Sequence, residues 1–252
     1  MSKHIRSQAG FTLVELAIVM IIIGLLIGGV LKGQELITNA QITSTVAQVK
    51  GIDAASTTFR DMYNGLPGDI LNPGARLNGC TTSVVCSAAA GDGNGLIGNA
   101  PGAAPATEAQ AYFIQLALAD LLTGVSPAAA AAACTAWGQC YPEANIAGGF
   151  QVGYTPGATA LTSASGGVAA NNRAGHYLTI SNDPNVAMTT NGVMNANQAA
   201  RIDTKIDDGI PSSGTVLAAG AAAGATGCAA TAALYNEAVT ADYCNLYIRI
   251  QN

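Results

Sequence analysis

The chain has few charged and few aromatic side chains. Charged residues make up 10% of its 252 positions, aromatic residues 5%, and there is a single tryptophan. Soluble domains usually carry about 25% charged residues. The 10 basic and 15 acidic residues give a net charge of −5, which excludes the clustered positive surface that nucleic-acid binding requires. No nucleic-acid partner is evident from the sequence.

Histidine is nearly absent as well. The two histidines, His4 and His176, leave little material for a histidine metal site or a histidine-relayed catalytic set. No phosphate-binding loop or dinucleotide fingerprint is present. We therefore expect a protein without catalytic activity.

Hydrophobic residues concentrate near the N-terminus. Residues 11–31 read FTLVELAIVMIIIGLLIGGVL, a run whose only ionisable side chain is Glu15. A helix of that length spans about 31 Å, close to the hydrocarbon thickness of a bilayer. Lys3 and Arg6 precede the run, so the positive-inside tendency predicts a cytoplasmic N-terminus and an exported remainder.

A removable signal peptide and a simple membrane anchor are the alternatives for this run. It is too long for a signal-peptide core, it contains an acid, and no small-x-small cleavage site closes it. A simple anchor, as in a solitary membrane-anchored binding protein, leaves Glu15 unexplained. Acids inside membrane helices are costly and mark a partner. The free amine at the N-terminus of a neighbouring chain would neutralise this one.

The junction that precedes the run resembles that of a known family. Gly10, followed by residues 11–16 (FTLVEL), is similar to the class III leader junction of type IV pilins and type II secretion pseudopilins. The resemblance implies that a prepilin peptidase cuts after Gly10 and methylates the amine of Phe11. Residues 1–10 are then the leader, and Glu15 meets the amine of an adjacent subunit's Phe11.

The resemblance also implies a function and a location. The precursor would insert in the inner membrane with its head in the periplasm, and would then polymerise with identical subunits into an extracellular helical filament. A pilus assembly platform and its motor would be further partners. We interpret the chain as a type IV pilus subunit, with a type II secretion pseudopilin as the alternative. Adhesion, motility and DNA-uptake roles are all compatible with the sequence.

The apolar helix is expected to continue beyond residue 33 as an amphipathic helix. A stripe at mostly three- and four-residue spacing predicts one continuous helix from Phe11 to Tyr63, about 53 residues and about 80 Å long. Residues 64–68 (NGLPG) supply a terminating glycine and a proline beyond it. The stripe consists of Ile42, Val46, Val49, Ile52, Phe59 and Met62.

Four glycines interrupt the apolar run. They allow close packing of helices in lipid, and they also lower helix stability, so helix packing and local melting on assembly are both open. Pilins often carry a proline where this chain has Lys32, so any break must come from the glycines. They are Gly24, Gly28, Gly29 and Gly33.

All six cysteines lie in the expected exported head, residues 64–252. An even number in an oxidising compartment indicates disulfides. Sequence neighbours suggest the pairs Cys80–Cys86, Cys134–Cys140 and Cys228–Cys244, although six cysteines permit 15 pairings. Zinc would require C-x2-C pairs or nearby histidines, and neither occurs.

The expected fold class is α+β, with a small antiparallel sheet on the long helix, extra helices and disulfides. Apolar spacing predicts helices over 108–122 and 195–208, and Ser126-Pro127 followed by alanines favours a short helix ending near Cys134. Strands are expected at 150–154, 176–180 and 246–250. The Gly/Ala/Ser-rich residues 155–172 and 212–230 are expected to be loops or poorly ordered surface.

Two acidic groups could hold calcium, although a tight turn and a solvated acidic corner are favoured and no cofactor is expected. Asp92 and Asn94 lie in a glycine-rich turn that fails the EF-hand pattern. Asp207 and Asp208 join Asp203 at a predicted helix end, where acids oppose the helix dipole and require a compensating partner. Residues 65–69 and 202–209 also loosely resemble recurrent stretches of large pilin-like heads.

Overall fold

The computed structural model describes residues 10–80, 85–86, 91–103, 107–126, 134–157, 161, 172–184, 192–220 and 227–250. The chain divides into two compact units, Met1–Ala40 and Gln41–Asn252. Helix α1 begins in the first unit and ends in the second. Each unit is described by itself.

Helix α1 extends from Leu13 to Tyr63 and has 51 residues, close to the predicted length. It ends at Asn64, whose φ of 47° places it in the left-handed region. The prediction that a glycine would end the helix is therefore wrong, because asparagine tolerates this conformation and comes one residue earlier. The Arg76 guanidinium donates a hydrogen bond to the free Tyr63 carbonyl.

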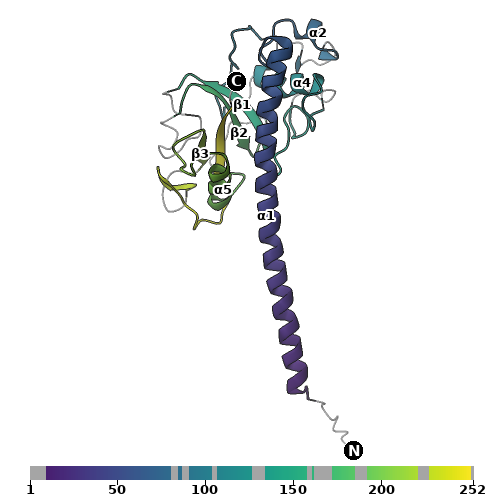
Figure 1. The fold of residues 1–252 in the computed structure, drawn as a ribbon, viewed down its shortest axis with the longest axis vertical. Helices are drawn as coiled ribbons and strands as arrows, with labels where there is room; N and C mark the ends of the chain where they lie inside the picture. Colours follow the sequence, from purple (N-terminus) through teal and green to yellow (C-terminus); the bar gives the residue numbers. More distant parts are fainter. Residues whose placement is uncertain are drawn as a thin grey trace, which may run out of the picture. The chain divides into compact units, whose positions relative to one another are not determined.

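The predicted apolar stripe of α1 packs into the head, with one exception. Ile42, Val46, Val49, Ile52 and Phe59 are buried, together with Ala55 and Ser56 between them. Met62 is 61% exposed, so its inclusion in the stripe is wrong. Within the second unit, Figure 1 shows the sheet and α5 on one side of α1 and α2 with α4 on the other.

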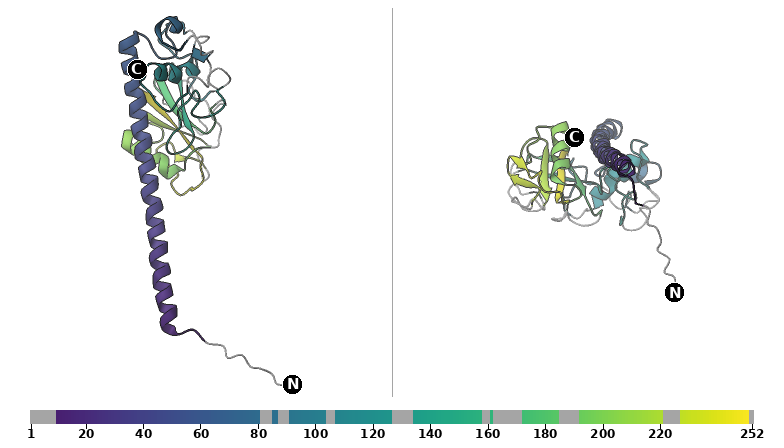
Figure 2. Two further views of the ribbon diagram at one scale, coloured as in Figure 1. Left: turned by 90° about the vertical axis from the view of Figure 1, so that its right-hand side faces the viewer. Right: turned by 90° about the horizontal axis from the view of Figure 1, so that it is seen from below.

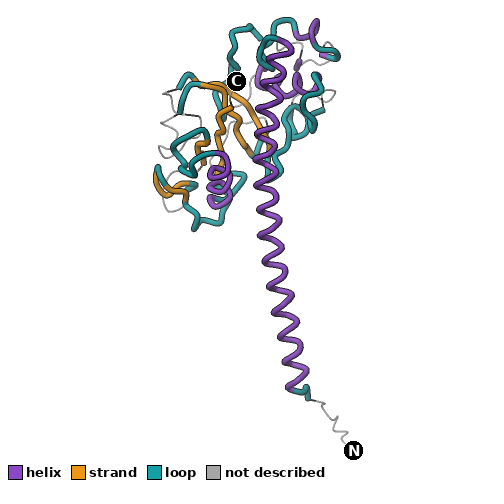
Figure 3. The backbone as a smooth tube through the Cα atoms, in the orientation of Figure 1, coloured by secondary structure: helices purple, strands orange, loops and turns teal. Residues whose placement is uncertain are grey.

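The head contains a four-stranded antiparallel sheet of order β1-β2-β6-β3, which Figure 3 shows in orange. Its strands are β1 (Gly149–Thr155), β2 (Gly175–Ser181), β6 (Cys244–Ile250) and β3 (Val216–Gly220). A two-stranded sheet pairs β4 (Ala229–Thr231) with β5 (Leu234–Tyr235). The three predicted strands are present, each slightly longer than expected.

Strand β3 lies in a region that the sequence assigned to a loop, so that assignment is wrong. Its sequence, VLAAG, has few of the β-branched and aromatic residues that favour strands. The strand forms because β6 offers it a complete ladder and because it buries both faces. Val216 packs into the main core, and Leu217 packs on the opposite face of the sheet.

Three short helices complete the described head: α2 (Pro73–Arg76), α4 (Thr107–Leu118) and α5 (Ala196–Ile206). Helix α4 ends four residues before the predicted end, and Asp120 adopts a φ of 56° two residues beyond it. Asn195 and Gln198 form a reciprocal capping box at the start of α5. The helix expected to end near Cys134 falls outside the described residues.

The main core lies between α1, α4 and one face of the four-stranded sheet. Residues from all three belong to a single cluster of buried apolar side chains, among them Phe59, Phe113 and Leu178. Figure 2 shows α5 next to the sheet in both views. Tyr177 and Tyr247 belong to a smaller cluster on the other face.

Three disulfides fix the head. Cys80 pairs with Cys86, Cys134 with Cys140, and Cys228 with Cys244, with Cα separations of 5.3, 5.4 and 4.9 Å. These are the pairs suggested by neighbouring positions in the sequence. With the long helix, the antiparallel sheet and the extra helices, they confirm the predicted α+β fold class.

Candidate functional site

The start of α1 carries the residues that the resemblance assigns to processing and assembly. Gly10 and Phe11 lie directly before the helix, and the Phe11 side chain is 87% exposed. Thr12 and Glu15 form a capping box, the pairing that a threonine and a glutamate three residues apart favour. The backbone N–H and the hydroxyl of Thr12 each donate to Glu15 Oε2 at 2.8 Å, and the Glu15 N–H donates to Thr12 Oγ1 at 3.3 Å.

This cap leaves half of the Glu15 carboxylate available. Both bonds from Thr12 go to Oε2, and within the described residues Oε1 accepts no hydrogen bond. A carboxylate in the first turn of a helix is favoured by the helix dipole. The arrangement holds the negative charge at a defined place and leaves Oε1 free to receive an ammonium group.

The helix that follows presents apolar side chains all around its circumference. Among the described residues α1 is the one helix that is long and apolar enough to cross a membrane, judged by length and composition. Contiguous exposed apolar surface of this extent marks an interaction with lipid or with protein. The exposed side chains are Leu13, Val14, Leu16, Ile18, Val19, Met20, Ile21, Ile22, Ile23, Leu25, Leu26, Ile27, Val30, Leu31, Leu36 and Ile37.

The four glycines of the apolar run do not interrupt α1, which stays helical through all of them. A Cβ atom added at any of the four would meet no atom within 4 Å. No other part of the described chain packs against these glycines. Their roles in packing between helices or in local melting stay predictions. The positions are Gly24, Gly28, Gly29 and Gly33.

The turn that contains Asp92 and Asn94 is organised by a third residue, Asp69. The Asp69 carboxylate accepts hydrogen bonds from the backbone N–H groups of Gly93 (2.9 Å) and Gly95 (2.7 Å). Asp92 in turn accepts from the backbone and side-chain amides of Asn94, at 3.0 and 2.7 Å. The structure thus joins two motifs that the sequence analysis treated separately, residues 65–69 and 92–95.

A third carboxylate, that of Glu108, lies close to this turn. Oxygen atoms of Asp69, Asp92 and Glu108 lie within 4.8 Å of one another, a spacing that a cation could bridge. Burial raises the pKa of both Asp69 and Glu108. The Gly98 N–H donates to Glu108 at 2.5 Å, so each of the three carboxylates accepts at least one hydrogen bond from a backbone amide.

The second acidic group gathers at the C-terminus of α5, as the sequence predicted. Oxygen atoms of Asp203, Asp207 and Asp208 lie within 4.8 Å of one another. The Asp208 carboxylate accepts a hydrogen bond from the Ile210 N–H (2.9 Å), and the Asp207 carboxylate accepts one from the Thr215 N–H. Backbone amides therefore provide the compensating partners that acids at a helix C-terminus need.

Asp203 is the buried member of this group. The hydroxyl of Tyr235 donates to its Oδ2 at 2.8 Å, whereas Oδ1 has no hydrogen-bond partner in the described part of the chain. Burial, together with the smaller effect of the charges of Asp208 and Asp207, raises the pKa of Asp203 to about 7. The trio could hold a divalent cation or a proton, and calcium there remains a hypothesis.

His176 and the cysteines do not form a catalytic set. His176 lies on β2, is buried beside Tyr154, and has a pKa lowered by burial to about 4. All six cysteines are in disulfides, so none is available as a nucleophile.

Residues 5–31 match the family described as the prokaryotic N-terminal methylation motif. This motif is the class III prepilin leader of type IV pilins and pseudopilins. A search of curated proteins and a search of solved structures each returned no match.

The match shows what the N-terminal region is similar to. Its leader junction and apolar segment are like those of type IV pilin-like and pseudopilin-like precursors, which a prepilin peptidase processes before filament assembly. The match covers residues 5–31 of 252, so the head contributes nothing to it.

Several residues of the head were not found by the sequence analysis. Tyr235 donates a hydrogen bond to Asp203, which lies 32 positions earlier in the sequence. Glu108 lies close to Asp69, which is about 40 positions earlier. Arg60 and Arg76 flank a pocket at the end of α1 that no local pattern indicated. The sequence signal for the two arginines is their rarity, since the chain has 10 basic residues among 252.

Proposed function

We propose that this chain is the precursor of a type IV pilus subunit. It inserts in the inner membrane through α1, loses residues 1–10, is methylated on Phe11, and polymerises through α1 into a surface filament. The observation that carries the proposal is the combination of the methylation motif with a long apolar helix whose side chains have no partner within the described chain. Lipid covers these side chains before assembly, and other subunits cover them afterwards.

Glu15 gives the assembled state its register. In lipid its carboxylate is costly unless a positive group approaches it. Cleavage after Gly10 creates an amine at Phe11, and the free Oε1 of Glu15 can accept that amine from a neighbouring subunit. A buried ion pair of this kind is weak evidence for stability but an effective device for fixing the relative position of two chains.

Processing is tested by measuring the mass and N-terminal sequence of the protein in cells with and without a prepilin peptidase. We expect the peptidase to remove residues 1–10 and to add one methyl group to Phe11. Gly10→Glu should block both changes. Gly51→Glu, at an exposed helical glycine with open space around it, should be processed normally. A mature protein that keeps its first ten residues would overturn the proposal.

Assembly is tested with Glu15→Leu. This variant should insert in the membrane and be cleaved, yet fail to enter filaments, since the incoming amine then has no carboxylate to meet. Glu35→Leu removes an acid from the same helix that is paired with Lys32 at 2.6 Å, and should leave assembly intact. The measurement is the amount of subunit in sheared filaments relative to the membrane fraction.

A type II secretion pseudopilin would share the cleavage, the methylation and the role of Glu15. The two functions separate in cells. Sheared surface filaments that contain this subunit support the pilus, whereas a secretion defect without such filaments would assign the chain to a pseudopilus.

A further inference from the structure

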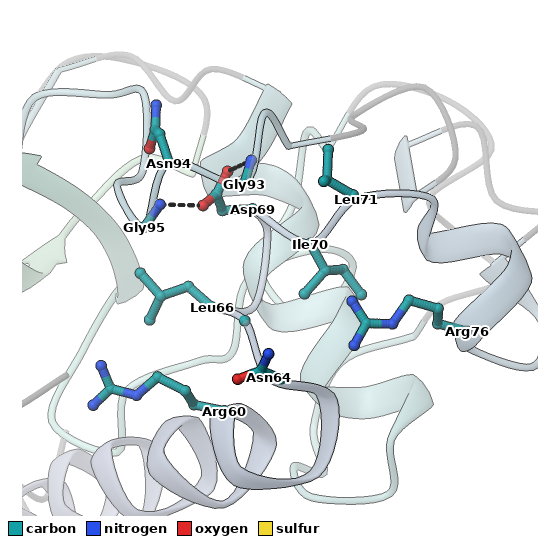
Figure 4. Close-up of a pocket in the computed structure, with 11 residues that line it drawn as sticks. Arg60, Asn64, Leu66, Asp69, Ile70, Leu71, Arg76, Gly93, Asn94 and Gly95 are labelled. Carbon is teal, nitrogen blue, oxygen red and sulfur yellow. Dashed lines mark hydrogen bonds between the residues drawn. The ribbon is translucent and has the colours of Figure 1, made fainter.

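A pocket of about 370 Å³ lies where α1 ends. Its walls come from the last turn of α1, from the turn that follows it, from the segment around α2, and from the 93–95 loop. Figure 4 shows Arg60 on one side of Asn64 and Arg76 on the other, with Asp69 and its two glycine contacts farther in. The two motifs joined by Asp69 therefore build one concave site, which the proposed filament role does not use.

The two arginines give the pocket positive charge, which is unusual in a chain whose net charge is −5. Within the described residues, no carboxylate lies within ion-pair distance of either guanidinium, although acids outnumber basic residues by 15 to 10. Arg60 is half-buried and donates no hydrogen bond to any described residue, while one Arg76 nitrogen is occupied by the Tyr63 carbonyl. His176 is the ionisable neighbour of Arg60, and its lowered pKa makes it neutral.

Asp69 lines the same pocket but does not neutralise the arginines. It is 2% exposed, and its two oxygens accept the Gly93 and Gly95 amides. These bonds tie the 93–95 loop to Asp69. The lining residues include two guanidinium groups and one carboxylate, so the lining carries a net charge near +1, which one monoanion balances; the carboxylates of Asp92 and Glu108, within 4.8 Å of that of Asp69, do not line the pocket.

Three leucine and isoleucine side chains form the apolar part of the wall, and Asn64 and Asn94 add polar amides to it. Leu66 and Ile70 are buried beneath the pocket, and Leu71 is 55% exposed at its edge. A ligand that fits these walls carries one negative group and an apolar group next to it. A guanidinium matches a carboxylate through two parallel hydrogen bonds, which gives both affinity and orientation.

We propose that this pocket binds a monocarboxylate that carries an apolar group, with the Arg76 guanidinium on the carboxylate, Leu71 on the apolar part, and Arg60 adding positive charge from the other side of Asn64. The free C-terminus of a peptide that ends in an apolar residue has this chemistry, as does a small N-acylated amino acid. A phosphate dianion exceeds the charge of the site, and an uncharged amide leaves the arginines without a partner.

The test is calorimetric binding of N-acetyl-leucine to the full chain in detergent micelles. We expect saturable one-to-one binding of N-acetyl-leucine. The uncharged analogue N-acetyl-leucinamide should bind at least about tenfold more weakly, because hydrogen bonds to charged groups are the stronger ones. Acetate, which lacks the apolar group, and inorganic phosphate should bind more weakly than N-acetyl-leucine. The tripeptide Ala-Ala-Leu distinguishes the two sources: tighter binding than N-acetyl-leucine indicates a peptide terminus, and equal binding indicates a small acid.

Variants assign the binding to the pocket. Arg60→Gln and Arg76→Gln should each weaken N-acetyl-leucine binding about tenfold, whereas Arg173→Gln, at an exposed arginine outside the pocket, should leave it unchanged. Leu71→Ala should reduce the preference for N-acetyl-leucine over acetate. Thermal unfolding followed by Trp137 fluorescence checks that each head is folded. Equal binding of the amide, tighter binding of phosphate, no binding of any carboxylate, or an equal loss in Arg173→Gln would overturn the proposal.

Discussion

The carboxyl group of Asp203 should make the stability of the head depend on pH. This side chain is 0% exposed, it accepts one hydrogen bond from Tyr235, and it faces the carboxylates of Asp207 and Asp208. Burial is the largest cause that raises its pKa, to about 7. An aspartate in an unfolded chain has a pKa of about 3.9.

The sign follows from counting protons in the two states. Between about pH 4 and pH 7 the folded head holds a proton on Asp203 that the unfolded chain has lost. The free energy of unfolding therefore falls as the pH rises through this window, by at most about 1.4 kcal/mol per pH unit. Over the window of about three units, the contribution of Asp203 is no more than about 4 kcal/mol.

The assay is urea unfolding of the full chain in detergent micelles at pH 5 to 8, followed by the fluorescence of Trp137, the single tryptophan. Asp203→Asn keeps an acceptor for Tyr235 and cannot ionise, so its stability relative to the wild type should rise from pH 5 to about pH 7 and level off above that. Asp61→Asn, at an exposed position of α1, should run parallel to the wild type. Asp69, Glu108 and His176 also titrate differently in the two states, but they cancel in the comparison. Parallel curves for Asp203→Asn would refute the reasoning.

Two further predictions use the same fluorescence assay. Phe59→Ala should reduce the free energy of unfolding by about 3–5 kcal/mol because it empties a fully buried site, whereas Met62→Ala, one turn away and exposed, should change it by less than about 0.5 kcal/mol. We also expect a calcium chelator to leave the unfolding midpoint unchanged, since backbone amides compensate Asp69, Asp207 and Asp208. A midpoint that falls on chelation and returns with calcium would show that one of the acidic groups holds the ion.

The sequence predicted the parts of the fold that local patterns determine. The periodic stripe located α1, alternation located β1, β2 and β6, and cysteine spacing suggested the disulfides. It missed β3, because VLAAG becomes a strand only when β6 is beside it. The predicted end of α4 was also four residues too late. The left-handed conformation of Asp120, just beyond the observed end, has no strong signal in the sequence.

The candidate sites divide in the same way. Gly10, Phe11 and Glu15 form a contiguous motif, so the sequence alone locates them. The pocket at the end of α1 could not be found, because Arg60, Arg76 and the 93–95 loop converge only through the fold. Asp69 illustrates the difference: the sequence placed it in a loosely recurrent stretch without a role, and its role emerges from two hydrogen bonds with residues 24 and 26 positions away.

The capping box at Thr12 gives the Glu15 experiment a second reading that must be separated from the first. Glu15→Leu removes both the negative charge and the acceptor of the Thr12 bonds. Glutamine at the same position retains a capping box, since its side-chain oxygen can still accept from the backbone N–H of the cap residue. If pairing with the neighbour's amine drives assembly, Glu15→Gln should be processed and start its helix normally, yet enter filaments as poorly as Glu15→Leu. If Glu15→Gln assembled like the wild type, the start of the helix and not the charge would be the requirement.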